Sequence, residues 1–417
     1  MPWRVCEPGD PAAGIRLSIA ADRPMISPEF AFVCRCAGAR SVPLPADIAY
    51  IETLDADRLA AIAHRHQVVP LVLDALRRAG MTVPPALAAG FDPVAPLRAA
   101  REAVRLRKLL AADGIAPLFL KGSALAVLAY GAIERRQFGD IDLLVRPSDA
   151  RRAAVLLGDA GYRAPGRPDG LADRVDRVSR FAKDMTLVHS TNGHIVELHW
   201  RMTDNPREQP VCEREAVQWV ELAPGSAIPT LGTEALFAYL CAHGGAHAWA
   251  RLRWLADVAA LLAQAEDGGD RLWRGAVALR QGRAAAAAIL LAGRYFGTPP
   301  PPSFTRPKSV RLMLLLRLSR RVIEAGGGTT ELARTRWRGW TEVAGKLLIA
   351  SSPGDLAGWI MRLLFSVSDE DVVGGSRSWY IVHPLQRIPK LLARRRLRRQ
   401  LLGASPPARA TAGGESA

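Results

Sequence analysis

Cysteine is scarce in this sequence of 417 residues. The five that occur are odd in number and irregularly spaced, namely Cys6, Cys34, Cys36, Cys212 and Cys241. A disulfide scaffold uses an even set, and a four-ligand zinc site uses short, paired spacings. The sequence therefore argues against both kinds of protein, and we expect Cys34 and Cys36 to be ordinary thiols.

Long hydrophobic runs are also missing. The most apolar stretch, residues 284–292, is about half as long as the roughly 20 residues that span a bilayer. A longer apolar region at 347–365 is interrupted by the sequence SSPGD at 351–355. The N-terminal sequence MPWRVCEPGDPAAGIR has proline and charges where a signal peptide has its apolar run. We therefore expect a cytoplasmic protein in a reducing compartment.

Acidic residues are fewer than basic ones. The chain has 40 Asp and Glu against 56 Lys and Arg, a formal net charge of +16. Residues 301–417 hold 20 basic and 8 acidic side chains, so the excess is concentrated in the last third of the chain. This distribution argues against a basic nucleic-acid coat that covers the whole protein.

The basic run RRRLRR at 394–399 follows an apolar stripe formed by Leu385, Ile388, Leu391 and Leu392. This pattern is typical of a helix that lies on an anionic membrane surface. The alternatives are an acidic partner or a basic surface that is simply solvated.

Hydrophobic residues make up 49% of the chain and charged residues 23%, which is enough apolar sequence for a sizeable core. Composition and periodicity divide the chain into five segments. These are a loose leader at 1–45, a helical region at 46–114, an α/β core at 115–230, a helical region with a basic end at 231–402 and a disordered tail at 403–417. We therefore expect an α+β protein in which a small mixed sheet is embedded between helical N- and C-terminal regions.

Short apolar runs mark the strands of the α/β core. Residues 117–120 and 141–145 fit buried strands, and residues 123–130 between them fit a helix. Two further apolar runs flank the sequence STNG at 190–193, and Asn-Gly in that position is a strong hairpin signal. Beyond the core, the periodicity predicts helices at 233–247, 252–265 and 271–295.

Two carboxylates belong to the second of these strands. Side chains alternate between the faces of a strand, so Asp140 and Asp142 point the same way while Ile141 and Leu143 point to the core. Like charges this close repel each other unless a cation lies between them, and hard oxygen ligands suit Mg²⁺ or Mn²⁺. The alternative is a solvated acidic pair at the end of a strand.

Two neighbouring motifs favour the metal interpretation. Lys121, Gly122 and Ser123 lead from a strand into a helix, where a glycine lets backbone amides approach an anion. The longer glycine-rich pattern of a Walker loop is absent. Glu197 shares its strand face with His199 and can supply a third carboxylate from an adjacent strand.

These residues carry a resemblance to known enzymes. FLKGS at 119–123, with Tyr130, Arg136 and DIDLLV at 140–145, resembles the signature of the DNA polymerase β-like nucleotidyltransferase superfamily. ELHW at 197–200 and HGGAHAWARLRWLADVAALL at 243–262 resemble one bacterial branch, the uncharacterised nucleotidyltransferase family. The resemblance extends over residues 55–265 and implies a polymerase β-like palm as the core.

Three features depart from the superfamily's usual pattern. The residue before the glycine is Lys121 where an apolar residue is usual, and the spacing between Ser123 and Asp140 is longer than usual. The third acid is Glu197, where aspartate is commoner.

The resemblance implies an enzyme that transfers a nucleoside monophosphate from an NTP, ATP before the others, to an acceptor and releases pyrophosphate. Asp140 and Asp142 would bind one Mg²⁺ or Mn²⁺ ion together with the triphosphate. Glu197 would help to bind a second ion and act as general base. The motifs do not identify the acceptor: a small molecule, a saccharide precursor, a peptide or protein, and a tRNA end all stay open.

The remaining motif residues would contact the nucleotide. Gly122 and Ser123 would hold the β- and γ-phosphates. Arg136 would neutralise phosphate charge, or else lie on the surface. Lys121 would either reach a phosphate or pair with the acids.

The histidines allow more than one interpretation. His199 is either a neighbour of the metal site or a framework residue. His243 and His247 have a spacing that can bind zinc on a helix, but residue 244 is glycine rather than the glutamate of that motif, so packing or an acceptor site fits better. One rival interpretation is a non-catalytic nucleotide-binding protein that retains the fold, and the presence of all three acids argues against it. The other is a membrane-surface or polyanion-binding protein that retains the fold, a function that can coexist with catalysis.

Overall fold

A computed structural model of the chain describes residues 26–38, 53–165, 170–179, 182–205, 217–325 and 338–364. The basic run at 394–399 and the tail at 403–417 lie outside the described residues.

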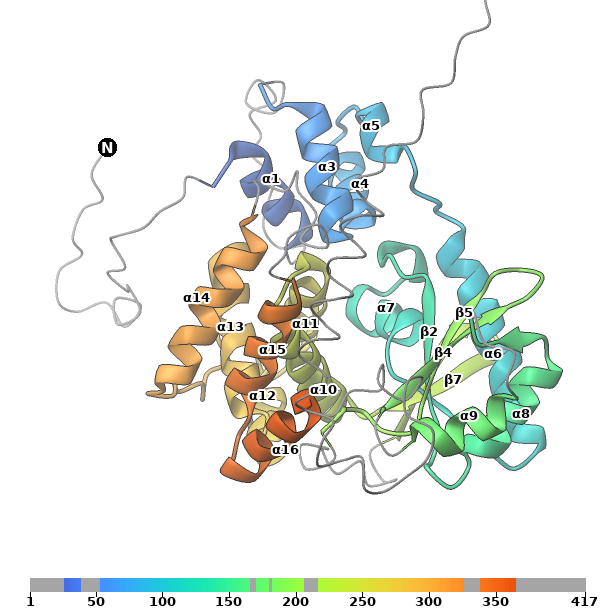
Figure 1. Cartoon of the computed structure of the whole chain (residues 1–417). Coiled ribbons are helices and arrows are strands. Elements are labelled where there is room, and N and C mark those ends of the chain that lie inside the picture. Colours follow the sequence, from blue (N-terminus) through green and yellow to red (C-terminus); the bar gives the residue numbers. More distant parts are fainter. Residues whose placement is uncertain are drawn as a thin grey trace, which may run out of the picture.

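The protein is α+β, as expected, with a mixed five-stranded sheet and many helices (Figure 1). The strands are β1 (Leu118–Phe119), β2 (Asp140–Leu144), β3 (Tyr162–Arg163), β4 (Asp184–His189), β5 (Ile195–His199), β6 (Val217–Ala223) and β7 (Ser226–Leu231). The helices before and within the sheet region are α1 (Pro28–Ala37), α3 (Ala56–His66), α4 (Val69–Arg78), α5 (Pro85–Ala88), α6 (Ala95–Ala112), α7 (Gly122–Tyr130), the 3₁₀ turn η2 (Ile133–Arg135), α8 (Ala150–Asp159) and α9 (Leu171–Val178). Those after it are α10 (Thr233–Ala246), α11 (Leu252–Gln264), α12 (Asp270–Ala278), α13 (Gly282–Phe296), α14 (Val310–Ile323), α15 (Arg338–Ile349) and α16 (Pro353–Leu364).

The five-stranded sheet has the order β1-β2-β5-β4-β3. Strands β2 and β5 are parallel, whereas β1 pairs with β2, β4 with β5 and β3 with β4 in antiparallel fashion. The parallel register places Asp142 opposite Glu197. Because neighbouring residues in register point to the same face of a sheet, the two carboxylates lie side by side.

The opposite face of the sheet is apolar and covered. Ile141, Leu143, Val196 and Leu198 are buried in one hydrophobic cluster with residues of α6, α8 and α9. The alternation expected around the acidic pair is therefore confirmed. The cluster anchors β2 and β5 from behind and leaves the polar face of the two strands open toward the helical half of the molecule.

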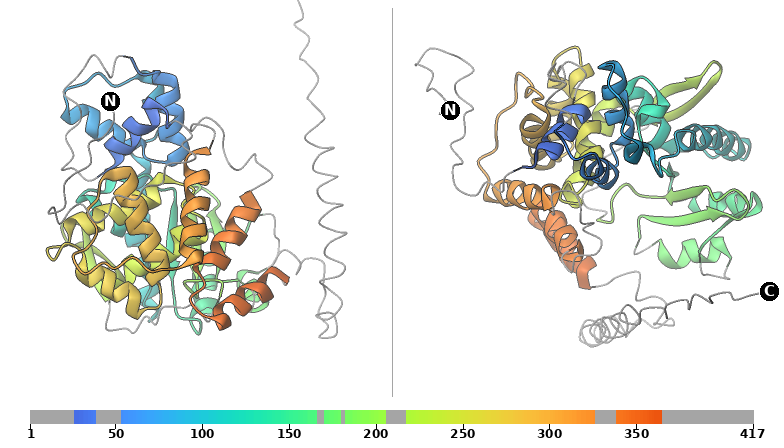
Figure 2. Two further views of the ribbon diagram at one scale, coloured as in Figure 1. Left: turned by 90° about the vertical axis from the view of Figure 1, so that its left-hand side faces the viewer. Right: turned by 90° about the horizontal axis from the view of Figure 1, so that it is seen from above.

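A second hydrophobic cluster joins the N-terminal helices to α10, α11, α13 and α14. Two further views show helices α1 to α5, in blue, covering one end of the molecule (Figure 2). Helix α7 connects the two clusters, because Leu125 and Ala129 belong to the second while Ala124 and Ala126 belong to the first.

Helix α1 corrects the expectation of a loose leader for residues 28–37. Ser27 caps its first turn by accepting a hydrogen bond from the amide of Phe30, and a proline begins the helix. Its apolar residues recur at helical spacing, and Phe30, Val33 and Cys34 are buried against α3, α4 and α13. The proline-rich composition of residues 1–45 therefore did not indicate this helix, which tertiary packing stabilises.

Other local predictions have mixed outcomes. The hairpin is confirmed, with β4 and β5 joined at Asn192 and Gly193, whose φ is 71°. The single helix predicted at 271–295 is wrong, because α12 ends at Ala278 and α13 begins at Gly282, with Arg280 in the left-handed region between them. The β6–β7 hairpin, which packs on β1, α6 and α7, was not predicted.

Among the described residues, none of the helices has the length and apolar character needed to cross a membrane. The apolar region at 347–365 is divided, as expected, between α15 and α16.

Candidate active site

A cavity of about 490 Å³ lies between the polar face of the sheet and the C-terminal helices. Most of its acidic side chains come from the sheet and its immediate neighbourhood, with Glu342 on α15 as an exception, and its aromatic ones come from the helices. The residues on the sheet side include Lys121, Asp140, Asp142, Lys183, Asp184 and Glu197; those on the helical side include Tyr239, His243, His247, Trp254, Lys346 and Trp359. The acids predicted from sequence thus share one cavity.

Asp142 and Lys121 form a buried ion pair in this cavity. Lys121 Nζ donates to Asp142 Oδ1 at 2.9 Å, and the Lys121 side chain is 11% exposed while that of Asp142 is 3% exposed. Burial raises the pKa of Asp142, but Lys121 and His199 offset this effect and hold it well below its usual range. Burial likewise disfavours the charged form of Lys121, yet Asp142, Tyr239 and Asp140 raise its pKa. Of the two roles considered for Lys121, pairing with the acids is the one present here.

Asp140 is half-buried, lines the same cavity and lies two residues before Asp142 on the same face of β2. Its negative charge contributes to raising the pKa of Lys121 and of Arg136. Asp140 therefore belongs to the acidic face and is the first residue of β2.

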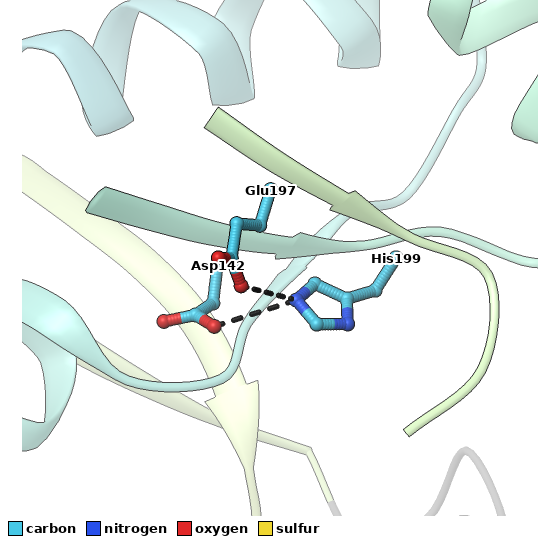
Figure 3. A group of neighbouring side chains, drawn as sticks. All are labelled: Asp142, Glu197 and His199. Atoms are coloured by element: carbon cyan, nitrogen blue, oxygen red, sulfur yellow. Dashed lines mark ion pairs between the residues drawn. The ribbon is translucent and has the colours of Figure 1, made fainter. Parts of the chain in front are cut away.

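His199 contacts both Asp142 and Glu197 (Figure 3). His199 Nε2 lies 3.3 Å from Asp142 Oδ1 and 3.4 Å from Glu197 Oε2. Contact with His199 lowers the pKa of Glu197, against the opposing effect of burial. One ligand atom from each of Asp142, Glu197 and His199 lies within 4.8 Å of the others.

Asp184 lies behind this group and was not predicted from the sequence. His199 Nδ1 is 3.5 Å from Asp184 Oδ2, and the two residues are direct partners in the β4–β5 ladder. The signal was present in the hairpin, because a tight turn at Asn192-Gly193 fixes the register that puts residue 184 opposite residue 199.

The glycine motif lies directly beside the acids. Leu120 donates its backbone N–H to the carbonyl of Asp142, so the chain enters α7 next to β2. Gly122 begins the helix with a φ of 62°, a conformation that favours glycine, and Ser123 is buried. No side chain caps the first turn of α7. Its amides are therefore positioned as donors for an anion.

Arg136 lies in a closed, buried ion pair. Its Nε and Nη2 donate to the two carboxylate oxygens of Asp257, each at 2.9 Å, and Tyr130 donates to Asp257 Oδ1 at 2.9 Å. The side chains of Arg136 and Asp257 are 2% and 0% exposed. Arg136 also borders the cavity, but its fork of donors is occupied by Asp257.

A cluster of rings forms the helical wall. His243 lies 4.8 Å from His247 and 5.2 Å from Trp254, measured between ring centroids. Burial and Lys121 lower the pKa of His243 well below its usual range, which disfavours the protonated form of this ring. Each histidine packs against Trp254, His243 edge-to-face and His247 at a tilt, which fits the packing or acceptor-site interpretation better than zinc.

The donor set at β2 and β5 fits a divalent cation. Two carboxylates in register, held on a rigid sheet, offer hard oxygen atoms, and the buried His199 has two ring nitrogens without a hydrogen-bond partner among the described residues. These carboxylates attract a cation electrostatically and have the ligand atoms to bind it, in competition with the Lys121 ammonium group that pairs with Asp142 in this structure.

The fold and the site define a protein that presents carboxylates of two parallel strands to a cavity beside a glycine-led helix. The family model of the uncharacterised nucleotidyltransferases matches residues 52–297. The match includes more than half of the chain, so the chain belongs to this family. Among curated proteins, no match was found. Helices α14, α15 and α16 lie beyond the matched residues, although α15 and α16 line the cavity.

Proposed function

We propose that the protein transfers a nucleoside monophosphate from an NTP to an acceptor with release of pyrophosphate. The observation that carries this proposal is the placement of Asp142 opposite Glu197 on parallel strands, facing a cavity next to the first turn of α7. Membership of a nucleotidyltransferase family supports the same class of reaction.

Asp140, Asp142 and Glu197 are the residues that we propose to hold Mg²⁺ or Mn²⁺. A bound divalent cation would neutralise charge on the triphosphate and on the attacking oxygen. The chain's own contribution is to keep these carboxylates ionised and fixed on the sheet, and the lowered pKa values of Asp142 and Glu197 serve that end.

The triphosphate would lie at the start of α7. Gly122 lets the backbone approach it, and the uncapped amides and the Ser123 hydroxyl are the donors. Lys121 contacts Asp142 here, and a phosphate beside it would share that ammonium group as a second anion. Arg136 has no such role in our proposal, because Asp257 occupies its guanidinium group.

Glu197 is our candidate general base. It lies at the cavity, its side chain is 30% exposed, and its lowered pKa keeps it ready to accept the proton of an acceptor hydroxyl. His199 contacts the same carboxylate and orients it.

The acceptor would bind at the helical wall. There, Lys346 Nζ lies 3.4 Å from Asp204 Oδ2 and 5.1 Å from the ring centroid of Trp359. His247 Nδ1 lies 3.6 Å from Glu342 Oε1. These residues combine rings, a cation and two carboxylates, as a polar small molecule, a saccharide precursor or a peptide side chain requires. Because α15 and α16 lie outside the family match, we propose that they set acceptor choice.

The test is a labelling screen with the four NTPs, ATP first, each carrying the label on its α-phosphate, in the presence of Mg²⁺ or Mn²⁺. The parent protein with cell extract should release pyrophosphate and label an acceptor, and Asp142→Asn should do neither. Equal labelling by the parent and by Asp142→Asn would refute the proposal.

A further inference from the structure

His199 is a buried histidine whose hydrogen-bonding capacity is unused. The residue is 0% exposed, and neither Nδ1 nor Nε2 has a hydrogen-bond partner among the described residues. Leaving a buried polar atom without a partner is unfavourable, so native proteins rarely do so without a compensating role. The ring also occupies a place on a central strand, β5, where an apolar residue would pack at lower cost.

Both ring nitrogens of His199 face carboxylates. Nε2 points into the gap between Asp142 and Glu197, at 3.3 and 3.4 Å from their nearest oxygens. Nδ1 points the other way, toward Asp184 at 3.5 Å. An imidazole with one nitrogen toward a pair of ligating oxygens and the other toward a further carboxylate has the arrangement of a metal-bound histidine.

We infer that His199 Nε2 is itself a metal ligand, together with Asp142 and Glu197, and that Asp184 accepts the Nδ1–H and fixes the ring. This inference rests on the proposed function, and it assigns to the site a nitrogen ligand that the sequence left open. Asp140 lies outside the converging group of three, which leaves it for the cation that accompanies the triphosphate.

The nitrogen ligand decides which metals suit the site. Mg²⁺ prefers oxygen ligands, whereas Mn²⁺ and the later divalent ions accept imidazole readily. We therefore expect the site to bind Mn²⁺ more tightly than Mg²⁺ before any nucleotide is present, and to lose much of this preference when the imidazole is replaced by an amide oxygen.

The experiment uses the full chain with Mn²⁺ and no nucleotide. Pulsed electron paramagnetic resonance detects coupling between bound Mn²⁺ and a directly coordinated ¹⁴N nucleus. The parent should show this coupling, and His199→Gln should lose it and bind Mn²⁺ at least about 10- to 100-fold more weakly, since that is the cost of removing even a residue that only orients a ligand. His247→Gln, which removes a histidine that lines the cavity but does not contact Asp142 or Glu197, should keep the coupling and the affinity for Mn²⁺.

Asp184→Asn is a second variant that tests the inference if His199→Gln does not fold. This variant keeps His199 as a ligand but weakens its orientation, so the nitrogen coupling should persist while Mn²⁺ affinity falls by about tenfold. Mn²⁺ bound to the parent without nitrogen coupling would overturn the inference and leave the proposed function intact. If the parent neither binds Mn²⁺ nor transfers a nucleotide with any metal, the proposed function itself fails.

Discussion

Two buried clusters of charged side chains lie near the same cavity, and they differ in how many of their polar atoms have a hydrogen-bond partner and in how their charges are balanced. In the first, Asp257 accepts three hydrogen bonds of 2.9 Å from Arg136 and Tyr130, and one positive charge meets one negative charge. In the second, Asp142 and Glu197 lie side by side, and His199 contacts both without a hydrogen bond.

The difference indicates which cluster acts on a ligand. A closed ion pair has no capacity left, so Arg136 and Asp257 hold α11 against the segment that leads into β2. The cluster on β2 and β5 keeps oxygen and nitrogen atoms for a further partner, and its local excess of negative charge suits a cation. This difference supports our proposal that the cluster on β2 and β5, and not the Arg136–Asp257 pair, is the functional one.

We call the cluster of Asp142, Glu197 and His199 the open cluster and the pair of Arg136 and Asp257 the closed cluster. The largest effect should come from removing one charge of the open cluster. Asp142→Asn keeps the size of the side chain but removes a metal ligand and the partner of Lys121. We expect turnover to fall by about 10³-fold or more, because a bound cation contributes several kcal/mol to stabilisation of the transition state. Metal-dependent NTP binding, followed by calorimetry, should be lost as well. A variant that binds metal and NTP like the parent would show that Asp142 is not a ligand.

The closed cluster should respond in stability instead. Asp257→Ala leaves Arg136 buried without its partner, and loss of one member of a buried ion pair costs about 3–5 kcal/mol of unfolding free energy. Denaturant unfolding of the variant and the parent measures this difference. Metal binding by the folded variant should stay as in the parent. Unchanged stability with weakened NTP binding would instead return Arg136 to the phosphate-binding role that the sequence suggested.

The two clusters were unequally predictable. The placement of Asp140 and Asp142 on one strand face could be predicted because strand alternation is a local rule, and the adjacent parallel strand places Glu197 where the sequence suggested. The pairing of Arg136 with Asp257 joins residues 121 positions apart, and no local pattern encodes which distant acid a buried arginine meets.

The helical regions show the same limit. Periodicity predicted the helices at 233–247 and 252–265 nearly to the residue, since each is a continuous element that packs on one core. The same periodicity predicted one helix where the structure has α12 and α13. Arg280 adopts a left-handed conformation, with a φ of 63°, in the turn between them, and the apolar spacing does not reveal this turn. The part that α15 and α16 play in the cavity wall depends on tertiary packing and was not predictable either.

Glu197→Gln tests whether the open cluster does chemistry as well as binding. The variant keeps the shape of the side chain and removes its ability to accept a proton. Turnover should fall by about 10²-fold, within the range that general-base catalysis contributes, while NTP binding largely survives. Rapid-quench kinetics beside an NTP titration separate these two quantities. If the rate is unchanged, the base lies elsewhere and Glu197 is part of the framework.

Lys121→Met removes the positive charge beside the open cluster, whereas the preceding variants of this cluster remove negative charges. Lys121 is the cation that Asp142 contacts in this structure, so its removal should raise the affinity of the site for Mn²⁺ in the absence of nucleotide. If the competition between Lys121 and the metal costs about 1.4 kcal/mol of binding free energy, the affinity should rise about tenfold. NTP binding should weaken at the same time, because a donor to phosphate is lost. Parallel titrations with Mn²⁺ alone and with Mn²⁺ plus NTP distinguish the two effects. Weaker binding of Mn²⁺ alone would mean that Lys121 organises the ligands and does not compete with the metal.

The smallest effect is expected at a third buried carboxylate, which is closed like Asp257 but lies away from the cavity. Glu102 on α6 accepts hydrogen bonds from Arg105 at 2.6 and 2.9 Å and from Tyr162 on β3 at 2.6 Å. Burial raises the pKa of Glu102, but the bonds from Arg105 and Tyr162 offset it and lower the pKa below its usual value.

A carboxyl whose pKa is lower in the folded state stabilises the fold at a pH above its unfolded-state pKa, and this contribution disappears as the pH falls through the folded-state pKa. The stability difference between the parent and Glu102→Gln should therefore be larger at about pH 7 than at about pH 3, since glutamine does not titrate. Urea unfolding at the two pH values measures the difference. Asp176→Asn, at an exposed pair with Arg151, is the matched control and should change stability little at either pH. Because Glu102 has no unused capacity, turnover and metal binding should stay as in the parent; a loss of metal binding in Glu102→Gln would break the rule that closed clusters act on stability alone.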